Sequence, residues 1–434
     1  MSRIVAVAPA LPLHRYAQSE IVEALLPFIT ADPARQSLMR RLHASCRVDT
    51  RHLVMPLEEY IDLGPFHETN ELFMSAGADL AERAIRNALA ASGLAATDVD
   101  YLLFTTVTGV AAPSLDAVLA ARLGMRSDLK RMPSFGLGCV AGAAGIARAH
   151  DYLQGHPDDV AVLVSVELCS LTVQRGDDSM ANLVASGLFG DGAAAVVMVG
   201  DERARSLAAT GPDVLGSRSA LYPGTGDVLG WDIGGTGFKI VLGAGVPSVI
   251  EHSFAADALK LVADHELGLD DIDVWMAHPG GPKVLEAFAA ALELPDDALA
   301  PSWRTMAAEG NLSSAAVLHV LADVMAGTPA GSTAAVSTPT AGTNGLLFAL
   351  GPGVTAELVL LRWPAAPLVG ERRERSEQRV SKPGQYAVEG NGFETLAGAR
   401  SSTTGAVPQV IETLAGARSS TTAAAPPVPA EAPA

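Results

Sequence analysis

Long apolar runs, cysteines and basic side chains are scarce in this 434-residue sequence, and each scarcity excludes a class of protein. Gly, Pro, Asp or Arg interrupts the longest apolar runs well before the roughly 20 residues that a membrane-spanning helix needs, so we expect no membrane span. The N-terminal residues lack the apolar run of a secretory signal, and the three cysteines cannot all pair with one another. These features favour the reducing cytoplasm, where a single thiol can be a reactive group.

Acidic residues outnumber lysine and arginine, which gives a formal charge of -18. Nonspecific nucleic-acid binding comes from clustered cations that neutralise phosphates, so we expect no nucleic-acid partner. Two basic clusters, within residues 40–52 and 122–131, are compatible with one anionic ligand or with ordinary surface charge. The sequence has neither a Gly-x-x-x-x-Gly-Lys-Ser/Thr phosphate loop nor a Cys or His cluster spaced for zinc, and we expect no metal and no resident cofactor.

The residues that are present predict a large folded body followed by a tail. Apolar residues make up 49% of the chain and charged residues 18%, and the length suggests roughly three domain-sized units. After Trp363 the composition shifts to Ala, Ser, Thr and Pro with little periodicity, which predicts a disordered low-complexity tail over 365–434. Within it the segment ETLAGARSSTT occurs twice. A duplicated linker is the favoured explanation, and a docking peptide and a cloning scar are the alternatives.

Before the tail, helical and strand-like patterns alternate, which is typical of an α/β protein. Apolar spacing predicts a helix over Phe73–Ser92, followed by a buried strand over Tyr101–Thr106. Later in the chain the same order returns, as a helix over Ala255–Glu266 and a strand within LDDIDVWMAHPGG. We therefore predict two similar halves, 1–205 and 206–364; chance similarity is the competing explanation.

The segment MPSFGLGCVAGAAGIARAHDYL places Cys139 between a short strand and an Ala/Gly-rich helix that begins near Val140. The free N–H groups and the dipole of a helix N-terminus favour a thiolate, so we expect the pKa of this thiol to be lowered. Small residues such as Gly138, Gly142 and Gly145 allow the helix to approach other backbone closely. The segment predicts a cysteine nucleophile; a small core residue is the alternative.

A cysteine nucleophile needs groups that hold the thiolate and move protons, and the second half supplies two candidates. His278 lies at the end of the predicted strand in VWMAHPGGPKVL, before residues that turn the chain sharply. Asn311 precedes an apolar helix in EGNLSSAAVLHVL. An amide beside an imidazole can donate to the oxygen of a polarised thioester, as in an oxyanion hole. A structural histidine and a helix N-cap are the alternative interpretations.

The motifs GLGCVAGA, AHPGGPKVL and GNLSSAAVL, in this order, resemble the Cys-His-Asn segments of type III polyketide synthases, within the thiolase superfamily. SVELCSL, LFGDGAAAVV and LGPGVTAEL fit the same family, so the resemblance covers the chain up to residue 363 but not the tail. It implies a five-layered αβαβα thiolase-like fold in a homodimer, with the nucleophile in the first half and His and Asn in the second. Within the family, we expect the chain to resemble bacterial alkylresorcinol and alkylpyrone synthases.

The resemblance also implies residue roles. Cys139 matches the acyl-carrying nucleophile, and His278 and Asn311 match the pair that stabilises the thiolate and then the enolate of malonyl-CoA. Two phenylalanines match the gate between the CoA tunnel and the cavity, and Arg41 resembles a contact to CoA phosphate. The substrate-binding positions implied in this way are Phe189, Phe238, Ser313, Ala112, Val173, Gly351, Pro352 and Arg41.

The function that follows is the synthesis of a cyclised polyketide from CoA thioesters, without a cofactor. Ala112 and Val173 stand where the family commonly has methionine and threonine, and a smaller or more apolar lining favours a long aliphatic starter. We expect an enzyme that loads a long-chain acyl-CoA on Cys139, extends it by decarboxylative Claisen condensation with malonyl-CoA, and closes an alkylresorcinol or alkylpyrone. The alternatives are a ketoacyl synthase that initiates fatty-acid synthesis with malonyl-carrier protein, and a non-catalytic acyl-CoA or lipid binder.

Overall fold

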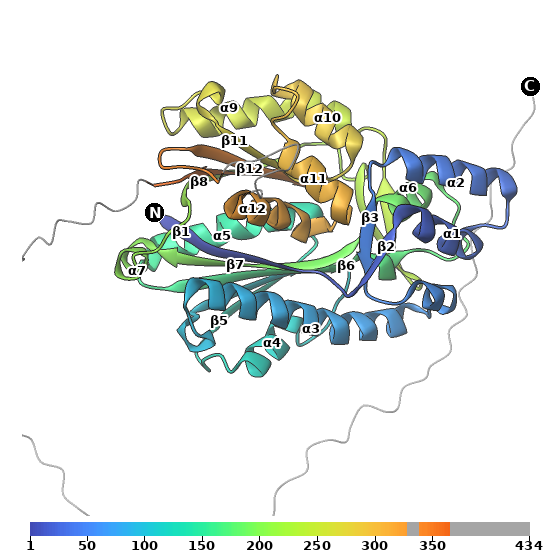
Figure 1. Cartoon of the computed structure of the whole chain (residues 1–434), viewed down its shortest axis with the longest axis horizontal. Helices are drawn as coiled ribbons and strands as arrows, with labels where there is room; N and C mark the ends of the chain where they lie inside the picture. The colour runs from blue at the N-terminus through green and yellow to red at the C-terminus, as the bar shows by residue number, and fades with distance from the viewer. Residues whose placement is uncertain (328–337, 365–434) are drawn as a thin grey trace, which may run out of the picture. The chain divides into compact units, whose positions relative to one another are not determined.

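The computed structural model describes residues 1–327 and 338–364. The predicted tail 365–434, with its repeated segment, lies outside the described residues. Helices and sheet alternate in five layers, as Figure 1 shows: two outer layers of helices, two layers of strands, and a pair of helices between the strands. The predicted thiolase-like αβαβα fold is therefore confirmed.

Nine strands hydrogen-bond in one continuous order, β11-β12-β13-β8-β1-β7-β6-β4-β5. Their bounds are β1 Ser2–Ala10, β4 Tyr101–Thr106, β5 Lys130–Phe135, β6 Val160–Leu168, β7 Asp191–Gly200, β8 Asp213–Leu221, β11 Val274–Ala277, β12 Asn344–Gly351 and β13 Thr355–Arg362. Strand β1 meets β8 over a short stretch, where Ser2 is opposite Val214 and Arg3 is opposite Asp213. This short seam joins two groups of strands that the middle helices otherwise keep apart.

The two groups of strands have similar pairing. In the first, β4 runs parallel to β6 and β5, while β7 runs antiparallel to β6 and to β1. In the second, β11 runs parallel to β12, and β13 runs antiparallel to β12 and to β8. Strand β4 has the predicted bounds, and all six of its residues are buried, as expected for a strand covered on both faces.

The middle layer consists of α5 (Ala141–Gly155) and α12 (Ala316–Ala326). One apolar cluster packs these two helices against both groups of strands, including Leu163 of β6 and Leu347 of β12. Small residues make this close packing possible, since a side chain at Gly145 would meet Leu163 at 2.5 Å. Both sheet layers therefore contact the same two helices, and the N-terminal ends of those helices meet in the interior.

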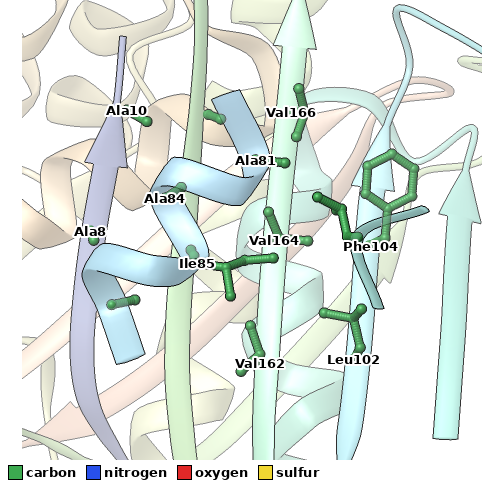
Figure 2. Packing of buried hydrophobic residues seen from close by; sticks show 14 of the residues in the cluster. Ala8, Ala10, Ala81, Ala84, Ile85, Leu102, Phe104, Val162, Val164 and Val166 are labelled. Carbon is green, nitrogen blue, oxygen red and sulfur yellow. The ribbon is translucent and has the colours of Figure 1, made fainter. Parts of the chain in front are cut away.

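The outer layer of the first half is α3 (Phe66–Ser92), which lies across β1, β7 and β6. Figure 2 shows Ala81, Ala84 and Ile85 of this helix against the valines of β6, of which Val164 is fully buried. Alanine at successive helical turns lets the helix axis approach the sheet, and burial of each large aliphatic side chain contributes roughly 1.5–3 kcal/mol. The helix ends at Gly93, whose φ of 69° is left-handed.

Among the other described elements, α4 packs against α3, β4 and β5 in the outer layer of the first half, and α7 contacts β1 and β7. The predicted helix over Ala255–Glu266 is α9, and it ends slightly earlier, at Ala263. Two short antiparallel pairs of strands are formed by β2 with β3, which α1 and α2 separate in the chain, and by the β9–β10 hairpin. The remaining bounds are α1 Gln18–Ile29, α2 Pro33–Ser45, α4 Leu115–Leu123, α6 Met180–Leu188, α7 Asp201–Ser206, α8 Val246–Val249, α10 Pro282–Ala291, α11 Ala300–Glu309, β2 His14–Ala17, β3 Thr50–Leu53, β9 Leu229–Gly234 and β10 Gly237–Leu242.

Short helical turns complete the described elements: η1 Leu57–Asp62, η2 Ala96–Asp98, η3 Gly138–Val140, η4 Cys169–Thr172, η5 Ile250–Phe254, η6 Leu269–Asp271 and η7 Ser313–Ala315. Among residues 1–327 and 338–364, no helix combines the length and apolar character needed to cross a bilayer.

Candidate active site

Cys139 lies in the turn between β5 and α5, as the sequence predicts. The chain leaves β5 at Phe135 and passes through Gly136 and Gly138, whose φ values of 98° and 58° are both left-handed. A side chain at Gly138 would also approach Pro352 Cδ at 2.4 Å. Two features therefore favour glycine at position 138: its left-handed backbone conformation and the closeness of Pro352.

The start of α5 touches the start of α12. A side chain at Gly142 would approach the backbone oxygen of Ser314 at 2.3 Å, so glycine allows the two helix ends to meet. The predicted role of glycine at this position is confirmed. Because Ser314 belongs to η7, which precedes α12, this contact brings the two halves together next to Cys139.

Asn311 is held by its backbone and by its amide. Its N–H donates to Leu188 O at 2.8 Å, and its carbonyl oxygen accepts from Gly190 N at 3.0 Å. Its side-chain Oδ1 accepts from Ser313 N at 2.8 Å, and Nδ2 donates to Gly280 O at 3.3 Å. The side chain therefore caps the turn before α12 and also reaches the loop that follows β11.

Cys139, Ser313 and Asn311 come together in one site. The thiol donates to Ser313 Oγ over 3.6 Å, and the Asn311 side chain also lies within hydrogen-bonding reach of the sulfur. His278 directly follows β11, and its N–H donates to Phe348 O at 2.8 Å. It is two residues from Gly280, the backbone partner of Asn311, and its Nδ1 is buried without a hydrogen-bond partner in the described part of the chain.

The structure holds the thiol and the imidazole in their neutral forms. Burial raises the pKa of Cys139 to about 12, although the hydrogen bond with Ser313 opposes the rise, and the charge of Glu167 raises it further. Burial lowers the pKa of His278 to about 3. The direction for Cys139 is opposite to the predicted one, because desolvation and a buried carboxylate outweigh the helix N-terminus.

That carboxylate, Glu167, is a residue whose role the sequence did not predict. It is fully buried on β6 and accepts from the hydroxyl of Thr108 at 2.8 Å and from the N–H of Val107 at 3.1 Å. Its other oxygen accepts from the hydroxyl of Ser314, which also lies 2.6 Å from Ser165 Oγ. Glutamate in the buried motif SVELCSL was the available signal, since a carboxylate in an otherwise apolar strand requires partners.

The two predicted gating phenylalanines lie beside the site. Phe189 pairs with Asn311 in an isolated β-bridge, and Phe238 is buried on β10. Phe238 contacts Phe66 edge-on, with ring centroids 5.3 Å apart, and Trp231 of β9 at 6.1 Å. The β9–β10 hairpin therefore contributes an aromatic wall next to the gate.

A small cavity of about 20 Å³ adjoins this wall. Phe189, Trp231, Ile240 and the predicted Val173 line it, together with Arg51. A cavity of this size has room for about one water molecule and not for an alkyl chain. Binding of a growing chain here requires side chains to move.

The other predicted substrate positions fall into two groups. Gly351, the last residue of β12, and Pro352 pack against the nucleophile turn, since a side chain at Gly351 would meet Leu137 O at 2.4 Å. Ala112 and Arg41 are exposed, Ala112 in the loop before α4 and Arg41 on α2. The structure thus brings Ser313, Gly351 and Pro352 together near Cys139 and leaves Ala112 and Arg41 at the surface.

The described residues hold no group of three His, Cys, Asp or Glu side chains that could bind a metal ion. What they do assemble is a half-buried thiol with an amide and a hydroxyl, at the meeting point of two helices in a five-layered thiolase-like fold. A cysteine thiol beside polar groups of this kind is suited to acyl transfer through a thioester, as in enzymes with a thiolase-like fold.

Family models narrow this class. Residues 1–202 match the N-terminal domain of chalcone and stilbene synthases, and residues 214–364 match their C-terminal domain. The chain belongs to the chalcone and stilbene synthase family, and it is a type III polyketide synthase, a transferase. The predicted family and enzyme class are confirmed, and the carrier-protein-dependent and non-catalytic alternatives are set aside.

Individual relatives agree with this assignment. The 1,3,6,8-tetrahydroxynaphthalene synthase of Streptomyces peucetius subsp. caesius is 54% identical over 360 residues, which cover 83% of this chain and 93% of that protein. The α-pyrone synthesis polyketide synthase-like Pks18 of Mycobacterium tuberculosis is 30% identical over 335 residues, covering 76% and 83% respectively. The crystal structure of tetrahydroxynaphthalene synthase from Streptomyces coelicolor A3(2) has a TM-score of 0.76 at 32% identity, with 84% of this chain and all of that chain covered.

Several expectations stay predictions. They are the boundary between the halves at residues 205 and 206, the absence of a resident cofactor, the roles of the individual site residues and the cytoplasmic location.

Proposed function

We propose that this enzyme loads an acyl-CoA starter on Cys139 and extends it by decarboxylative Claisen condensation with malonyl-CoA. The observation that carries the proposal is the convergence of the Cys139 thiol, the Ser313 hydroxyl and the Asn311 amide at the junction of α5 and α12. These groups come from both halves of the chain, and the buried Asn311 and Ser313 present their polar atoms to a half-buried thiol, where water competes less for the reacting atoms than at the surface.

In the loading step, the neutral imidazole of His278 takes the proton of the Cys139 thiol. The sulfur attacks the thioester carbonyl, a new C–S bond forms, and the C–S bond to CoA breaks. The CoA thiolate then takes the proton from the imidazolium and leaves as a thiol. The pKa values of about 12 for Cys139 and about 3 for His278 mean that this transfer is uphill in the resting site. The developing thiolate therefore needs the hydrogen bonds of Ser313 and Asn311.

In the extension step, malonyl-CoA loses carbon dioxide, and the electron pair of the broken C–C bond passes into an enolate. Asn311 Nδ2 and the His278 ring donate to the enolate oxygen. The enolate carbon attacks the acyl group, a C–C bond forms, and the C–S bond to Cys139 breaks to restore the thiolate. Because loss of carbon dioxide drives the condensation, the chemistry needs neither a redox cofactor nor a metal.

For the starter and product, we propose a short starter derived from malonyl-CoA and a polyhydroxylated aromatic product of the tetrahydroxynaphthalene type. One observation supports it: the 54% identical relative is named 1,3,6,8-tetrahydroxynaphthalene synthase. In such a reaction one type of CoA thioester serves as both starter and extender.

The second candidate is the long-chain acyl starter that the sequence predicts, with an alkylresorcinol or alkylpyrone product. The aliphatic lining of the small cavity beside the gate favours it, since Ile21, Leu25, Val173 and Ile240 would contact an alkyl chain once the side chains move apart. The relative named for α-pyrone synthesis supports it as well, at a lower identity of 30%.

One experiment separates the two candidates. Purified enzyme is incubated with malonyl-CoA alone and with malonyl-CoA plus acyl-CoA starters of graded length, and the products are identified by mass spectrometry. A malonyl-only aromatic product in the first reaction supports the short starter. Products whose mass increases with the length of the acyl-CoA starter, with no product from malonyl-CoA alone, support the long-chain starter instead.

We also propose that the enzyme works as a homodimer. Strand β5 ends the strand order, and Met132, Phe135 and Leu137 beside the nucleophile turn expose 37–45% of their surface. A groove of about 420 Å³ next to them is lined in part by Ala112 and Phe135. An unpaired edge strand with exposed apolar side chains is a ready surface for a second copy. Sedimentation of the full chain tests this, and a monomer at micromolar concentration would contradict it.

A further inference from the structure

An ion pair between a buried histidine and a half-buried glutamate lies next to the turn that carries Asn311. Glu309 is the last residue of α11, and His319 lies within α12, where 4% of its surface is exposed. His319 Nδ1 is 2.8 Å from Glu309 Oε2, and Nε2 is 2.9 Å from the carbonyl oxygen of Ala193 on β7. The histidine therefore connects α11, α12 and β7 through one ring.

Both neighbours of the ring are hydrogen-bond acceptors. A carbonyl oxygen and an ionised carboxylate cannot donate, so only the imidazolium, with an N–H on each side, satisfies both contacts. Burial by itself would lower the pKa of His319, but the charge and hydrogen bond of Glu309 and the hydrogen bond to Ala193 outweigh it and raise the pKa. The charged side chain that acts on His319 among the described residues is Glu309.

The pair spans the residues proposed to act on substrate. Asn311 and Ser313 lie between Glu309 and His319 in the chain. Glu309 is directly followed by Gly310, whose φ of 76° is left-handed and where a side chain would meet Leu188 O at 2.6 Å. On the other side, a side chain at Gly190 would meet the Glu309 carbonyl oxygen at 2.5 Å. The segment from Glu309 to His319 therefore packs closely against the residues that flank Phe189. The two members of the ion pair are its first and last residues.

We propose that Glu309 and His319 form a positioning pair, which holds the turn over Gly310–Ser313 so that the Asn311 amide faces the reacting oxygen. The inference rests on the proposed role of Asn311 in enolate stabilisation. Neither member of the pair touches substrate. A misplacement of about 1 Å in an oxyanion donor slows a reaction by roughly 100-fold, so a pair that fixes the turn contributes to rate as well as to stability.

The design of the variants follows from the two acceptors. In Glu309→Ala the turn loses its tie to α12. In Glu309→Gln the amide can donate to Nδ1 of a neutral His319, while Nε2–H still donates to Ala193, so every contact remains satisfied without charge. Glu309→Gln therefore keeps the geometry and removes the dependence on protonation.

The pH dependence has a definite sign. The pKa of His319 in the folded protein is raised, so its contribution is complete below the ordinary pKa of about 6.5 and is lost as the pH rises through the raised value. The pKa values of His278 and Cys139, about 3 and about 12, lie well outside this window. Loss of activity as the pH rises from the ordinary histidine pKa of about 6.5 through the raised value, abolished by Glu309→Gln, is the expected signature.

The experiment compares the full-length wild-type protein with Glu309→Ala, Glu309→Gln and Asn311→Ala. The readouts are kcat and KM for malonyl-CoA decarboxylation and product formation between pH 6 and 9, and the rate of Cys139 alkylation by iodoacetamide. We expect Glu309→Ala to lower kcat by about tenfold with little change in KM or alkylation rate. We expect Glu309→Gln to restore most of kcat and to flatten the alkaline limb.

Asp213→Ala provides a matched control, because it breaks the similarly half-buried Arg3–Asp213 pair at the seam between β1 and β8. It should lower the melting temperature without lowering kcat. An unchanged kcat in Glu309→Ala, or an alkaline limb that persists in Glu309→Gln, would overturn the positioning pair. If Asn311→Ala loses activity in the same assay, the proposed role of Asn311 still holds. A fully active Asn311→Ala would instead refute the role of Asn311 and, with it, the inference.

Discussion

The turns that precede α5 and α12 occupy equivalent places in the two halves, but they are stabilised differently. The first, which carries Cys139, depends on glycine and close packing, with Gly138 against Pro352 and apolar side chains such as Phe135 left exposed. The second, which carries Asn311, is buried and held by polar contacts from its own half and from α6 and β7. The turn of Cys139 thus leaves apolar side chains exposed, whereas the turn of Asn311 is stabilised within the chain.

The two turns also differ in the buried and half-buried charges beside them. Glu167 belongs to the first half and reaches Ser314 of the second half, so the carboxylate connects the two turns. The ion pair of Glu309 and His319 belongs to the second half alone. Removal of either carboxylate should therefore affect a different partner, Cys139 in one case and Asn311 in the other.

The largest effect is expected from removal of the nucleophile in the first turn. Cys139→Ala should lower chain extension by at least about 1,000-fold, because no other group in the turn can carry the acyl chain. Mass spectrometry should show one acyl group on the wild-type protein and none on the variant. Cys46→Ala is the control. The thiol of Cys46 donates to Leu42 O in α2, so the variant that lacks it should retain activity. Acylation at another residue in Cys139→Ala would contradict the assignment.

A smaller effect is expected when the contact between the two turns is pushed apart. Gly142→Ala places a methyl group against Ser314 O and should destabilise the fold by roughly 1–3 kcal/mol, with a drop in kcat. Gly155→Ala lies in the same helix with nothing within 4 Å and should change stability by less than about 1 kcal/mol. Denaturant unfolding and steady-state kinetics measure both. Equal behaviour of the two variants would show that the helix ends are not closely packed.

The carboxylate that joins the turns should control the thiol without serving as a catalytic group. The charge of Glu167 raises the pKa of Cys139, so Glu167→Gln should lower that pKa and move the pH profile of alkylation by iodoacetamide to lower pH. Glu357→Gln removes another buried carboxylate, on β13, and should leave the profile in place. If the alkylation profile shifts in both variants, or in neither, then Glu167 does not specifically raise the pKa of Cys139.

The smallest effect is expected at the surface. Arg41 is exposed on α2, so Arg41→Ala should raise the KM for malonyl-CoA by only about threefold, because solvent and salt screen an exposed charge. The difference should shrink further in high salt, with kcat unchanged. Arg86→Ala, which removes an arginine paired with Glu82 on α3, is the control. A change in kcat would mean that Arg41 acts on more than CoA binding.

Much of the fold, and the place of Cys139 in the turn between β5 and α5, could be predicted from local sequence patterns. Strand β4 has the predicted bounds, and α3 has the predicted end at Gly93, because burial and left-handed glycine have strong local signatures. The closeness of Gly142 to other backbone was also predictable, since small residues in a helix near a candidate nucleophile indicate close packing. These features depend on residues that are near one another in the chain.

The direction of the Cys139 pKa shift was not predictable in this way. The helix N-terminus that favours the thiolate is visible in the sequence, but the desolvation and the charge of Glu167 that outweigh it come from other elements. The partners of His319 were equally hidden, because Ala193 lies on β7, far from it in the chain. Neither the burial of a side chain nor the identity of a distant acceptor follows from local periodicity.

By itself, the amino-acid sequence determined the alternation of helices and strands, the glycine-lined turn of Cys139 and the order of motifs that indicates the family. The tertiary structure alone decided that the thiol and His278 are neutral, that the cavity beside the gate has room for about one water molecule, and that His319 faces two acceptors. The physical reason is that secondary structure arises from neighbouring residues, whereas desolvation, cavity size and buried ion pairs arise from groups that meet only when the two halves pack around α5 and α12.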